Sequence, residues 1–296
     1  MSHFFYHMYG LNICSELELL GQKKCALTAA VDVMITRTSV SSTGIQNPIE
    51  STPFFQANND YIWINVPTVA RFLIKQGQHI FFEPAFDRDE NILSSFVYGP
   101  CMVALLMQRD LFVLKGAVFQ QNDGAIACLG AACSGKSSLM AILAQRGYPI
   151  LSDDLCVLNK QGEVFPGPSR IELWDDNIEL LQGKLPLIDT TRLAQKKHCF
   201  STADSAVEHS VSLSKIYILN QSQRDTLKYE MIHGAQKISE LQKNVYNRFY
   251  LNALGKSHLY FSYVGHFAQH YEMRSIQFNR GQYSTFEIAN DLQGAI

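Results

Sequence analysis

Residues 130–137 read Gly-Ala-Ala-Cys-Ser-Gly-Lys-Ser, a complete G-x-x-x-x-G-K-[ST] pattern. The apolar stretch 124–129 before it has the length of a strand, and 138–147 after it has apolar residues at helical spacing and ends on glycine. A strand, a glycine loop and a helix in this order form a cradle of backbone N–H groups that stabilises negative charge. The pattern predicts a phosphate loop that binds a purine nucleoside triphosphate. The expected nucleotide contacts are Gly130, Ala131, Ala132, Cys133, Ser134, Gly135, Lys136, Ser137 and Ser138.

Two of these residues carry side chains suited to phosphate chemistry. We expect the Lys136 ammonium to reach the outer phosphates, and the Ser137 hydroxyl to ligate a magnesium ion. Both roles require the loop to lie at the N-terminus of the following helix.

A pair of adjacent acids follows the loop at short range. The apolar residues of 149–158 predict a strand, and they flank Ser152-Asp153-Asp154. In a parallel sheet the carboxyl ends of the strands form the ligand side, where the phosphate loop also lies. One carboxylate can hold magnesium, and the other can accept the proton of an attacking hydroxyl. Neighbouring like charges raise the pKa of one of them, which suits a base that works near neutrality.

These motifs resemble a known family. Residues 130–139 and 144–155 resemble the catalytic domain of HPr kinase/phosphorylase, and still more the HPr-kinase-related kinases found beside biosynthetic peptide clusters, including those of lasso peptides. In those kinases a phosphate loop is followed by an Arg-Gly turn and a strand that ends in Ser-Asp-Asp. Residues 9–16 resemble their opening Y-G-L-x-I-x-S-E strand, and 166–174 resemble their P-G-x-P-x-x-x-L-W segment, with Ser169 in place of the second proline. The resemblance covers most of the chain and is thin over 175–296.

The resemblance implies an α/β phosphate-loop kinase domain of the HPr kinase/PEP carboxykinase-like type, preceded by a small β-rich domain. It implies an ATP- and Mg²⁺-dependent enzyme that transfers the γ-phosphate to a serine hydroxyl of a protein, peptide or small molecule. By position, Asp153 would be the base and Asp154 a metal ligand with Ser137, although the sequence does not separate the roles of the two acids. Arg170 and Arg248 are candidate contacts to the acceptor or its phosphate.

One position departs from the family pattern. The family places a histidine after a leucine in the strand before the phosphate loop, whereas this chain has Leu114-Lys115. Lysine can donate to phosphate, but its ordinary pKa of about 10 makes it a poor proton shuttle. We therefore expect Lys115 to support forward transfer without phosphorolysis. The substitution leaves a second interpretation open, a non-catalytic ATP-binding protein that recruits a partner. A carboxykinase-like enzyme is less well supported, because its metal-binding lysine and histidine pair is not found.

Composition narrows the class of protein. The 296 residues carry a formal net charge of -2 and no basic block, which argues against a nucleic-acid or membrane-surface binder. The seven cysteines are scattered and form no C-x-x-C pair, which is typical of reduced thiols in the cytoplasm. The N-terminus does not read as a signal peptide, and the apolar run 102–107 is too short to span a bilayer. We expect a soluble cytoplasmic protein that could form a homo-oligomer.

The sequence divides into a β-rich domain over 1–100 and a catalytic domain over 101–296. Expected strands lie at 30–36, 61–66, 79–83, 111–119, 125–129, 149–158, 211–219 and 272–278. Expected helices lie at 67–74, at 91–109 with a break near Gly99-Pro100, at 138–147 and at 236–254, and 175–200 reads as irregular.

Overall fold

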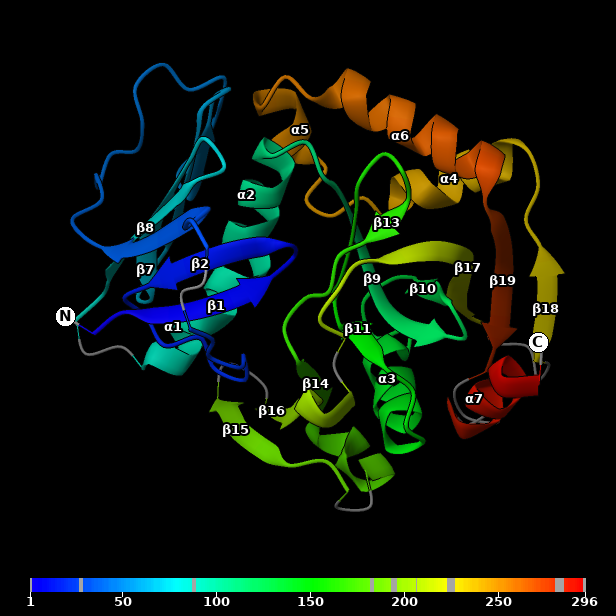
Figure 1. The fold of residues 1–296 in the computed structure, drawn as a ribbon. Coiled ribbons are helices and arrows are strands. Elements are labelled where there is room, and N and C mark those ends of the chain that lie inside the picture. The colour runs from blue at the N-terminus through cyan, green and yellow to red at the C-terminus, as the bar shows by residue number, and fades with distance from the viewer. Residues whose placement is uncertain are drawn as a thin grey trace. The chain divides into compact units, whose positions relative to one another are not determined.

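The computed structural model describes residues 2–26, 29–86, 89–181, 184–192, 196–205, 207–222, 227–279 and 285–294. These residues form a mixed α/β protein with two eight-stranded sheets and one three-stranded sheet (Figure 1). The chain groups into two compact units, the first made of residues 1–113 and 246–262 and the second of 114–245 and 263–296. These units differ from a linear division at residue 100, because 101–113 group with the first unit and the chain returns to it at 246–262.

The first unit is built on a mixed sheet with the strand order β1-β2-β3-β8-β7-β6-β5-β4. The pairs β2–β3 and β3–β8 are parallel, and the run from β8 to β4 is an antiparallel meander. The strands are β1 (Phe4–Met8), β2 (Leu11–Ser15), β3 (Val33–Arg37), β4 (Glu50–Thr52), β5 (Phe55–Ala57), β6 (Tyr61–Val66), β7 (Ala70–Lys75) and β8 (His79–Pro84).

The prediction of a helix at 67–74 is wrong. This segment is a turn followed by β7, in which buried and partly buried residues alternate. Thr68 has a φ of 64°, which turns the chain back so that β7 pairs with β6. The alternation of Ala70, Phe72 and Ile74 has the period of a strand, and it outweighs the proline that suggested a helix start.

The broken helix expected at 91–109 is confirmed. It consists of α1 (Glu90–Phe96), the π-helical segment Val97–Cys101 and α2 (Met102–Gln108), with Gly99 outside the helical region at φ -86° and ψ -106°. Among the described residues, the stretch Glu90–Gln108 is long and apolar enough to cross a membrane by length and composition alone. The same test is passed by core helices, and 61% of the stretch is buried inside the protein, so it is weak evidence for a membrane span.

The helix expected at 236–254 is two helices. α4 (Ala235–Lys243) belongs to the second unit and α5 (Phe249–Ala253) to the first. Asn247, with a φ of 42°, breaks the helical backbone between them. The following helix, α6 (Ser257–His270), begins in the first unit and ends in the second.

The second unit holds the glycine-rich segment 130–137 on a mixed sheet. β10 pairs in parallel with β17, and β17 in parallel with β19. β9 is antiparallel to both β10 and β11, so β10 and β11 run in the same direction. The carboxyl ends of β10, β11, β17 and β19 therefore point to the same edge. The strands of this sheet are β9 (Phe112–Gln121), β10 (Gly124–Leu129), β11 (Ile150–Ser152), β12 (Leu155–Leu158), β13 (Glu163–Val164), β17 (Val211–Gln221), β18 (Lys228–Met231) and β19 (Glu272–Phe278).

The segment 175–200 is not irregular. A 3-10 helix (Asp175–Leu181) is followed by β15 (Leu187–Arg192) and β16 (Lys196–Ser201), which form a three-stranded sheet with β14 (Arg170–Trp174). The apolar residues Ile171, Leu173 and Phe200 join the core of the unit, while Arg170 and Glu172 alternate with them. A strand with one polar face carries a weak apolar signal, which explains why sequence patterning missed this sheet.

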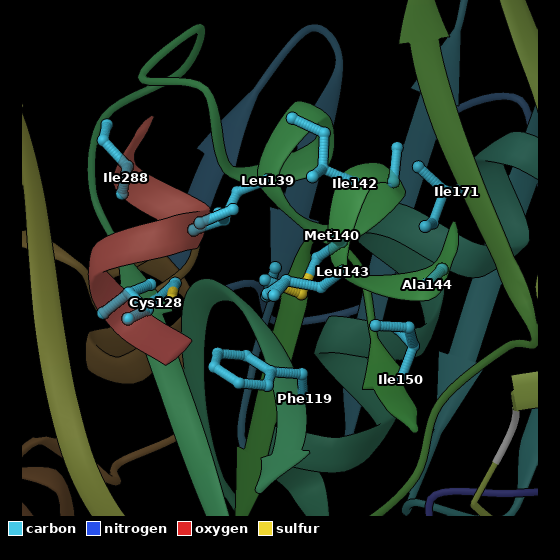
Figure 2. Close-up of a cluster of buried hydrophobic side chains, with 14 of the residues drawn as sticks. Phe119, Cys128, Leu139, Met140, Ile142, Leu143, Ala144, Ile150, Ile171 and Ile288 are labelled. Carbon is cyan, nitrogen blue, oxygen red and sulfur yellow. The ribbon is translucent and has the colours of Figure 1, made fainter. Parts of the chain in front are cut away.

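Helix α3 (Lys136–Gln145) lies in the middle of the second unit. Leu139, Met140, Ile142 and Leu143 are all buried, and the helix packs against β14 and against α7 (Thr285–Gly294). Figure 2 shows these side chains with Ile171 and Ile288 beside them. A helix that is apolar around most of its circumference is typical of a protein core. This packing holds the N-terminus of α3 in place directly after the loop.

Candidate active site

The loop between β10 and α3 has a backbone that its glycines make possible. Gly130 has a φ of +150°, and a Cβ atom there would lie 2.6 Å from the Leu219 carbonyl oxygen. Gly135 is the N-cap of α3 in the left-handed region, with a φ of 93°, and no side chain there caps the helix. Within this fully described segment, the first N–H groups of α3 thus have no capping side chain at Gly135, which is the arrangement that anion-binding helix termini use.

Lys136 points back into the loop. Its Nζ donates to the carbonyl oxygens of Gly130 at 2.8 Å and Ala131 at 2.7 Å, and to Ser134 Oγ at 3.2 Å. The side chain is buried, and this burial, followed by the charge of Lys115, lowers the pKa of Lys136. Phosphate oxygens would compete with these carbonyl groups for the same three N–H donors. The lysine is therefore placed to hold the loop together and to exchange its partners for a phosphate.

Ser137 and Asp153 are in direct contact. Ser137 Oγ donates to Asp153 Oδ1 at 3.0 Å, and the Glu172 backbone N–H donates to Asp153 Oδ2 at 3.3 Å. The expected single strand over 149–158 is split at this point into β11 and β12. Asp154 has a φ of 77°, and Ser152 Oγ donates to the Leu155 carbonyl oxygen across the turn. The break sets the two acids at the end of β11.

The Asp153 carboxyl has a strongly shifted pKa. Burial raises the pKa of Asp153 to about 7, with the negative charge of Asp154 acting in the same direction and the hydrogen bonds from Ser137 and the Glu172 amide acting against it. A carboxyl with this pKa exchanges its proton near neutral pH, which a general base requires. Asp153 thus combines direct contact with the Ser137 hydroxyl and a pKa near neutrality.

Lys115 and Asp154 lie on neighbouring backbone segments. The Gly116 N–H donates to the Asp154 carbonyl oxygen at 2.9 Å, and the Lys115 N–H donates to the Asn244 carbonyl oxygen at 2.6 Å. The charges of Lys115, Asp153 and Asp154 all act on the pKa of Lys136. The structure therefore brings the loop lysine, the strand lysine and both acids into one electrostatic site.

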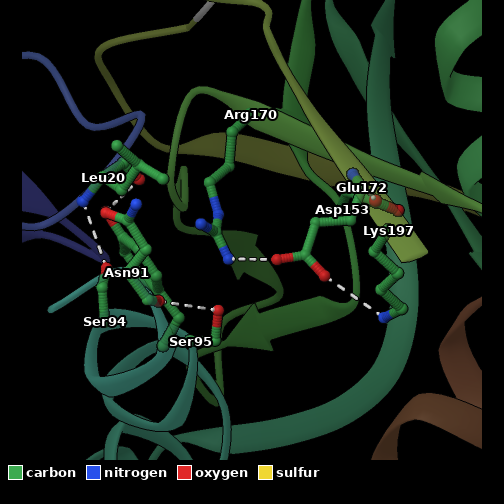
Figure 3. Close-up of polar contacts among 9 residues, drawn as sticks. Leu20, Asn91, Ser94, Ser95, Asp153, Arg170, Glu172 and Lys197 are labelled. Carbon is green, nitrogen blue, oxygen red and sulfur yellow. Dashed lines mark hydrogen bonds and ion pairs between the residues drawn. The ribbon is translucent and has the colours of Figure 1, made fainter. Parts of the chain in front are cut away.

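Arg170 reaches the same site through a residue that sequence analysis missed. Arg170 Nη2 lies 2.6 Å from Glu172 Oε1, and Lys197 Nζ lies 3.2 Å from Glu172 Oε2 (Figure 3). Burial alone would raise the pKa of Glu172, but Arg170 and Lys197 outweigh it, and the pKa is lowered. Lys197 Nζ also lies over the Trp174 ring, 4.7 Å from its centroid. The signal for Glu172 was its period-two spacing from Arg170 and Trp174, which puts the three side chains on one face of a strand.

The remaining predicted contacts fall into two groups. Ser134 and Ser138 are buried, and Ala131, Ala132 and Cys133 are exposed along the loop. Arg248 belongs to the first unit, where it is exposed at the N-cap of α5. Its role as a substrate contact stays a prediction.

The available oxygen atoms fit magnesium bound together with a nucleotide. The described residues contain no group of three or more histidine, cysteine or acidic side chains that could hold a metal ion. Magnesium usually keeps several waters and binds through one or two carboxylates and the phosphates of its substrate. The Ser137 hydroxyl and the Asp153 carboxylate, in contact at 3.0 Å, supply two oxygen ligands of this kind, and the exposed Asp154 follows directly in the chain.

Comparison with known proteins finds a likeness among solved structures only. No family model matches the chain, and no curated protein matches it. Among solved structures, the Hpr(Ser) kinase/phosphatase from Coxiella burnetii is similar, with a TM-score of 0.31 and 10% identity over 62% of this chain and 95% of that chain. At this TM-score the likeness carries no conclusion about activity. The family resemblance inferred from residues 130–155 stays a prediction, and the chemistry has to be inferred from the site residues.

Proposed function

We propose that the protein is an ATP-dependent kinase that transfers the γ-phosphate to a serine hydroxyl of a protein, a peptide or a small molecule. The contact between Ser137 Oγ and Asp153 Oδ1 carries this proposal, because it joins the phosphate-loop hydroxyl to an acid on a neighbouring strand. An acid beside the loop hydroxyl can hold Mg²⁺, and transfer to a hydroxyl requires in addition a group that accepts a proton beside the phosphates.

Each residue of the site has its own role in the proposed reaction. The loop N–H groups and Lys136 bind the phosphates, and Ser137 with Asp154 would hold Mg²⁺, which neutralises phosphate charge when bound. Asp153 accepts the proton of the attacking hydroxyl. The acceptor oxygen forms a bond to the γ-phosphorus, the bond from that phosphorus to the β–γ bridging oxygen breaks, and ADP leaves with the bonding electrons. Arg170, paired with Glu172 on the strand whose backbone N–H donates to Asp153, would stabilise the charge of the transferred group.

Lys115 favours transfer in the forward direction. A reverse step with inorganic phosphate needs a group that gives and takes protons near neutral pH, and a lysine ammonium does so poorly. Incubating phosphorylated product with inorganic phosphate should leave it intact. Rapid dephosphorylation under these conditions would contradict this part of the proposal.

Mass spectrometry of candidate acceptors incubated with ATP and Mg²⁺ tests the proposal. Lys136→Ala should abolish product formation, because it removes the ammonium from the loop. Lys243→Ala is the matched control, since Lys243 is an exposed residue of the same unit that pairs with Glu240. Wild-type protein and Lys243→Ala should give equal product. Equal product from Lys136→Ala would overturn the assignment of the site.

A second candidate function is ATP-dependent recruitment of a partner without phosphate transfer. Lys115, in place of a proton-shuttling histidine, favours this alternative. Asp153→Asn separates the two functions, because it removes the base. A kinase loses its product with this variant, whereas a recruiting protein keeps both ATP binding and its partner.

A further inference from the structure

The side chain of Gln221 holds the middle of the phosphate loop. Gln221 Nε2 donates to the Cys133 carbonyl oxygen at 2.7 Å, across 88 positions of the sequence. Gln221 is the last residue of β17, which pairs in parallel with β10, so its side chain emerges at the edge where the loop begins. No sequence pattern singled out this residue.

This contact fixes the orientation of one peptide group. A trans peptide is planar, so its C=O and N–H bonds point in opposite directions. The Ser134 N–H donates across the loop to the Ala131 carbonyl oxygen at 3.3 Å, and it therefore faces the loop interior. The Cys133 carbonyl faces the other way, where Gln221 meets it. The glutamine amide thus holds the Cys133–Ser134 peptide plane from one side, while the Ser134 N–H is bonded to Ala131 within the turn on the other.

The backbone at this point needs such support. Cys133 has a φ of 61°, a left-handed conformation that residues other than glycine adopt rarely and at a cost. The end of β17 also lies against the start of the loop, because the Leu219 carbonyl oxygen is only 2.6 Å from the position that a Cβ on Gly130 would take. β17 therefore contacts the loop at two places, through Leu219 at its first residue and Gln221 at its middle.

We infer that Gln221 is a positioning residue of the nucleotide site. It acts through the Cys133–Ser134 peptide, and its amide keeps the loop in the form that accepts phosphates before a nucleotide arrives. The inference rests on the proposed nucleotide site but not on phosphate transfer. It holds equally if the protein binds ATP without catalysis.

Direct titration of ATP with Mg²⁺ into Gln221→Met tests the inference, because methionine keeps the length of the side chain and removes the donor. Gln277→Met is the matched control: Gln277 lies on β19 of the same sheet, and its side chain donates to Glu230 of β18 at 2.8 Å. We expect about three- to tenfold weaker ATP binding for Gln221→Met, the range for one neutral hydrogen bond, and wild-type binding for the control.

Alkylation of Cys133 gives a readout that needs no nucleotide. Cys133 and Cys25 are the exposed cysteines among the described residues, and Cys25, in the other unit, serves as the internal reference. Gln221→Met should raise the modification rate of Cys133 severalfold relative to Cys25, and Gln277→Met should not. Wild-type protein that binds no ATP would refute the proposed function, while the alkylation rates would still test the contact.

The inference is overturned if Gln221→Met matches Gln277→Met in ATP binding. Faster alkylation with unchanged binding would show that Gln221 holds the loop without preparing it for phosphates, and it too would overturn the inference. Weaker binding together with faster alkylation supports it.

Discussion

The hydroxyl of Ser137 donates to Oδ1 of Asp153 at 3.0 Å, across 16 positions of the sequence. Ser137 lies in the first turn of α3, and Asp153 follows β11. β10 and β11 both flank β9 and run in the same direction, so the loop after one strand and the acid after the other meet at one edge. Substitution of each acid can therefore test which one acts as the base and which one binds the metal ion.

Asp153→Asn and Asp154→Asn should fail in different ways. If Asp153 is the base, phosphate transfer by its asparagine variant is slower by about 100-fold or more, while the Mg²⁺ concentration that the variant requires stays the same. If Asp154 is the metal ligand, its variant needs more Mg²⁺ and recovers rate as the metal concentration rises. Phosphate transfer measured over a Mg²⁺ series distinguishes these outcomes. The opposite pattern would exchange the roles of the two acids.

The raised pKa of Asp153 predicts a pH-dependent gain in stability for Asp153→Asn. The pKa is about 7 in the folded protein and near 4 in an unfolded chain, so the folded state binds the proton more tightly. The stability of the wild-type protein therefore falls as pH rises through this window, and the asparagine variant escapes that loss. Unfolding in urea with EDTA present should show a larger gain at pH 8 than at pH 5, by roughly 2–3 kcal/mol. An equal gain at both pH values would contradict the shift.

Glu172→Gln tests the ion-pair network. The change leaves Arg170 and Lys197 without their shared carboxylate, while the backbone N–H that bonds Asp153 remains. Because the Arg170 and Glu172 side chains are only 10% and 23% exposed, we expect a loss of about 1–3 kcal/mol in the free energy of unfolding. Glu240→Gln, which breaks a pair with the exposed Lys243, should cost less than about 1 kcal/mol. Urea unfolding of the two variants compares them, and equal losses would show that the network adds nothing.

The site was easier to predict than the sheet that completes it. The strand, loop and helix at 124–147 follow from an apolar run, a glycine pattern and helical spacing, all of which are local signals. The contact between Ser137 and Asp153 was foreseeable, because the two strands were expected to end at the same edge. Gln221 was not, since its partner Cys133 lies 88 positions away in the sequence. Glu172 was overlooked because it lies on a strand of the sheet that sequence patterning missed. The sheet β14–β16–β15 was missed because only one face of its strands is apolar.

Leu143→Ala should destabilise the second unit without changing the chemistry of the site. Leu143 is fully buried on α3, within the core cluster that Figure 2 shows. Its truncation to alanine would leave a cavity in this core. The expected cost is about 2–5 kcal/mol in the free energy of unfolding. Thermal unfolding measures the loss, and ATP titration well below the transition should give an affinity close to that of the wild type. A large loss of affinity in a folded variant would mean that core packing sets the shape of the loop.

Lys115→His tests why the reaction should run in one direction. The backbone N–H of residue 115 is bonded to the Asn244 carbonyl, so the new side chain starts from the same place on β9. Histidine has an ordinary pKa of about 6.5 and exchanges protons near neutrality, which a lysine ammonium does not. If the proposed kinase activity is correct, this variant should transfer the phosphoryl group of the phosphorylated acceptor to added inorganic phosphate, which gives pyrophosphate and the free serine hydroxyl, and the wild type should not. Lys115→Gln serves as the control, because it removes the charge without adding a proton carrier. Equal release by the histidine and glutamine variants would show that charge at position 115, and not proton transfer, limits the reverse reaction.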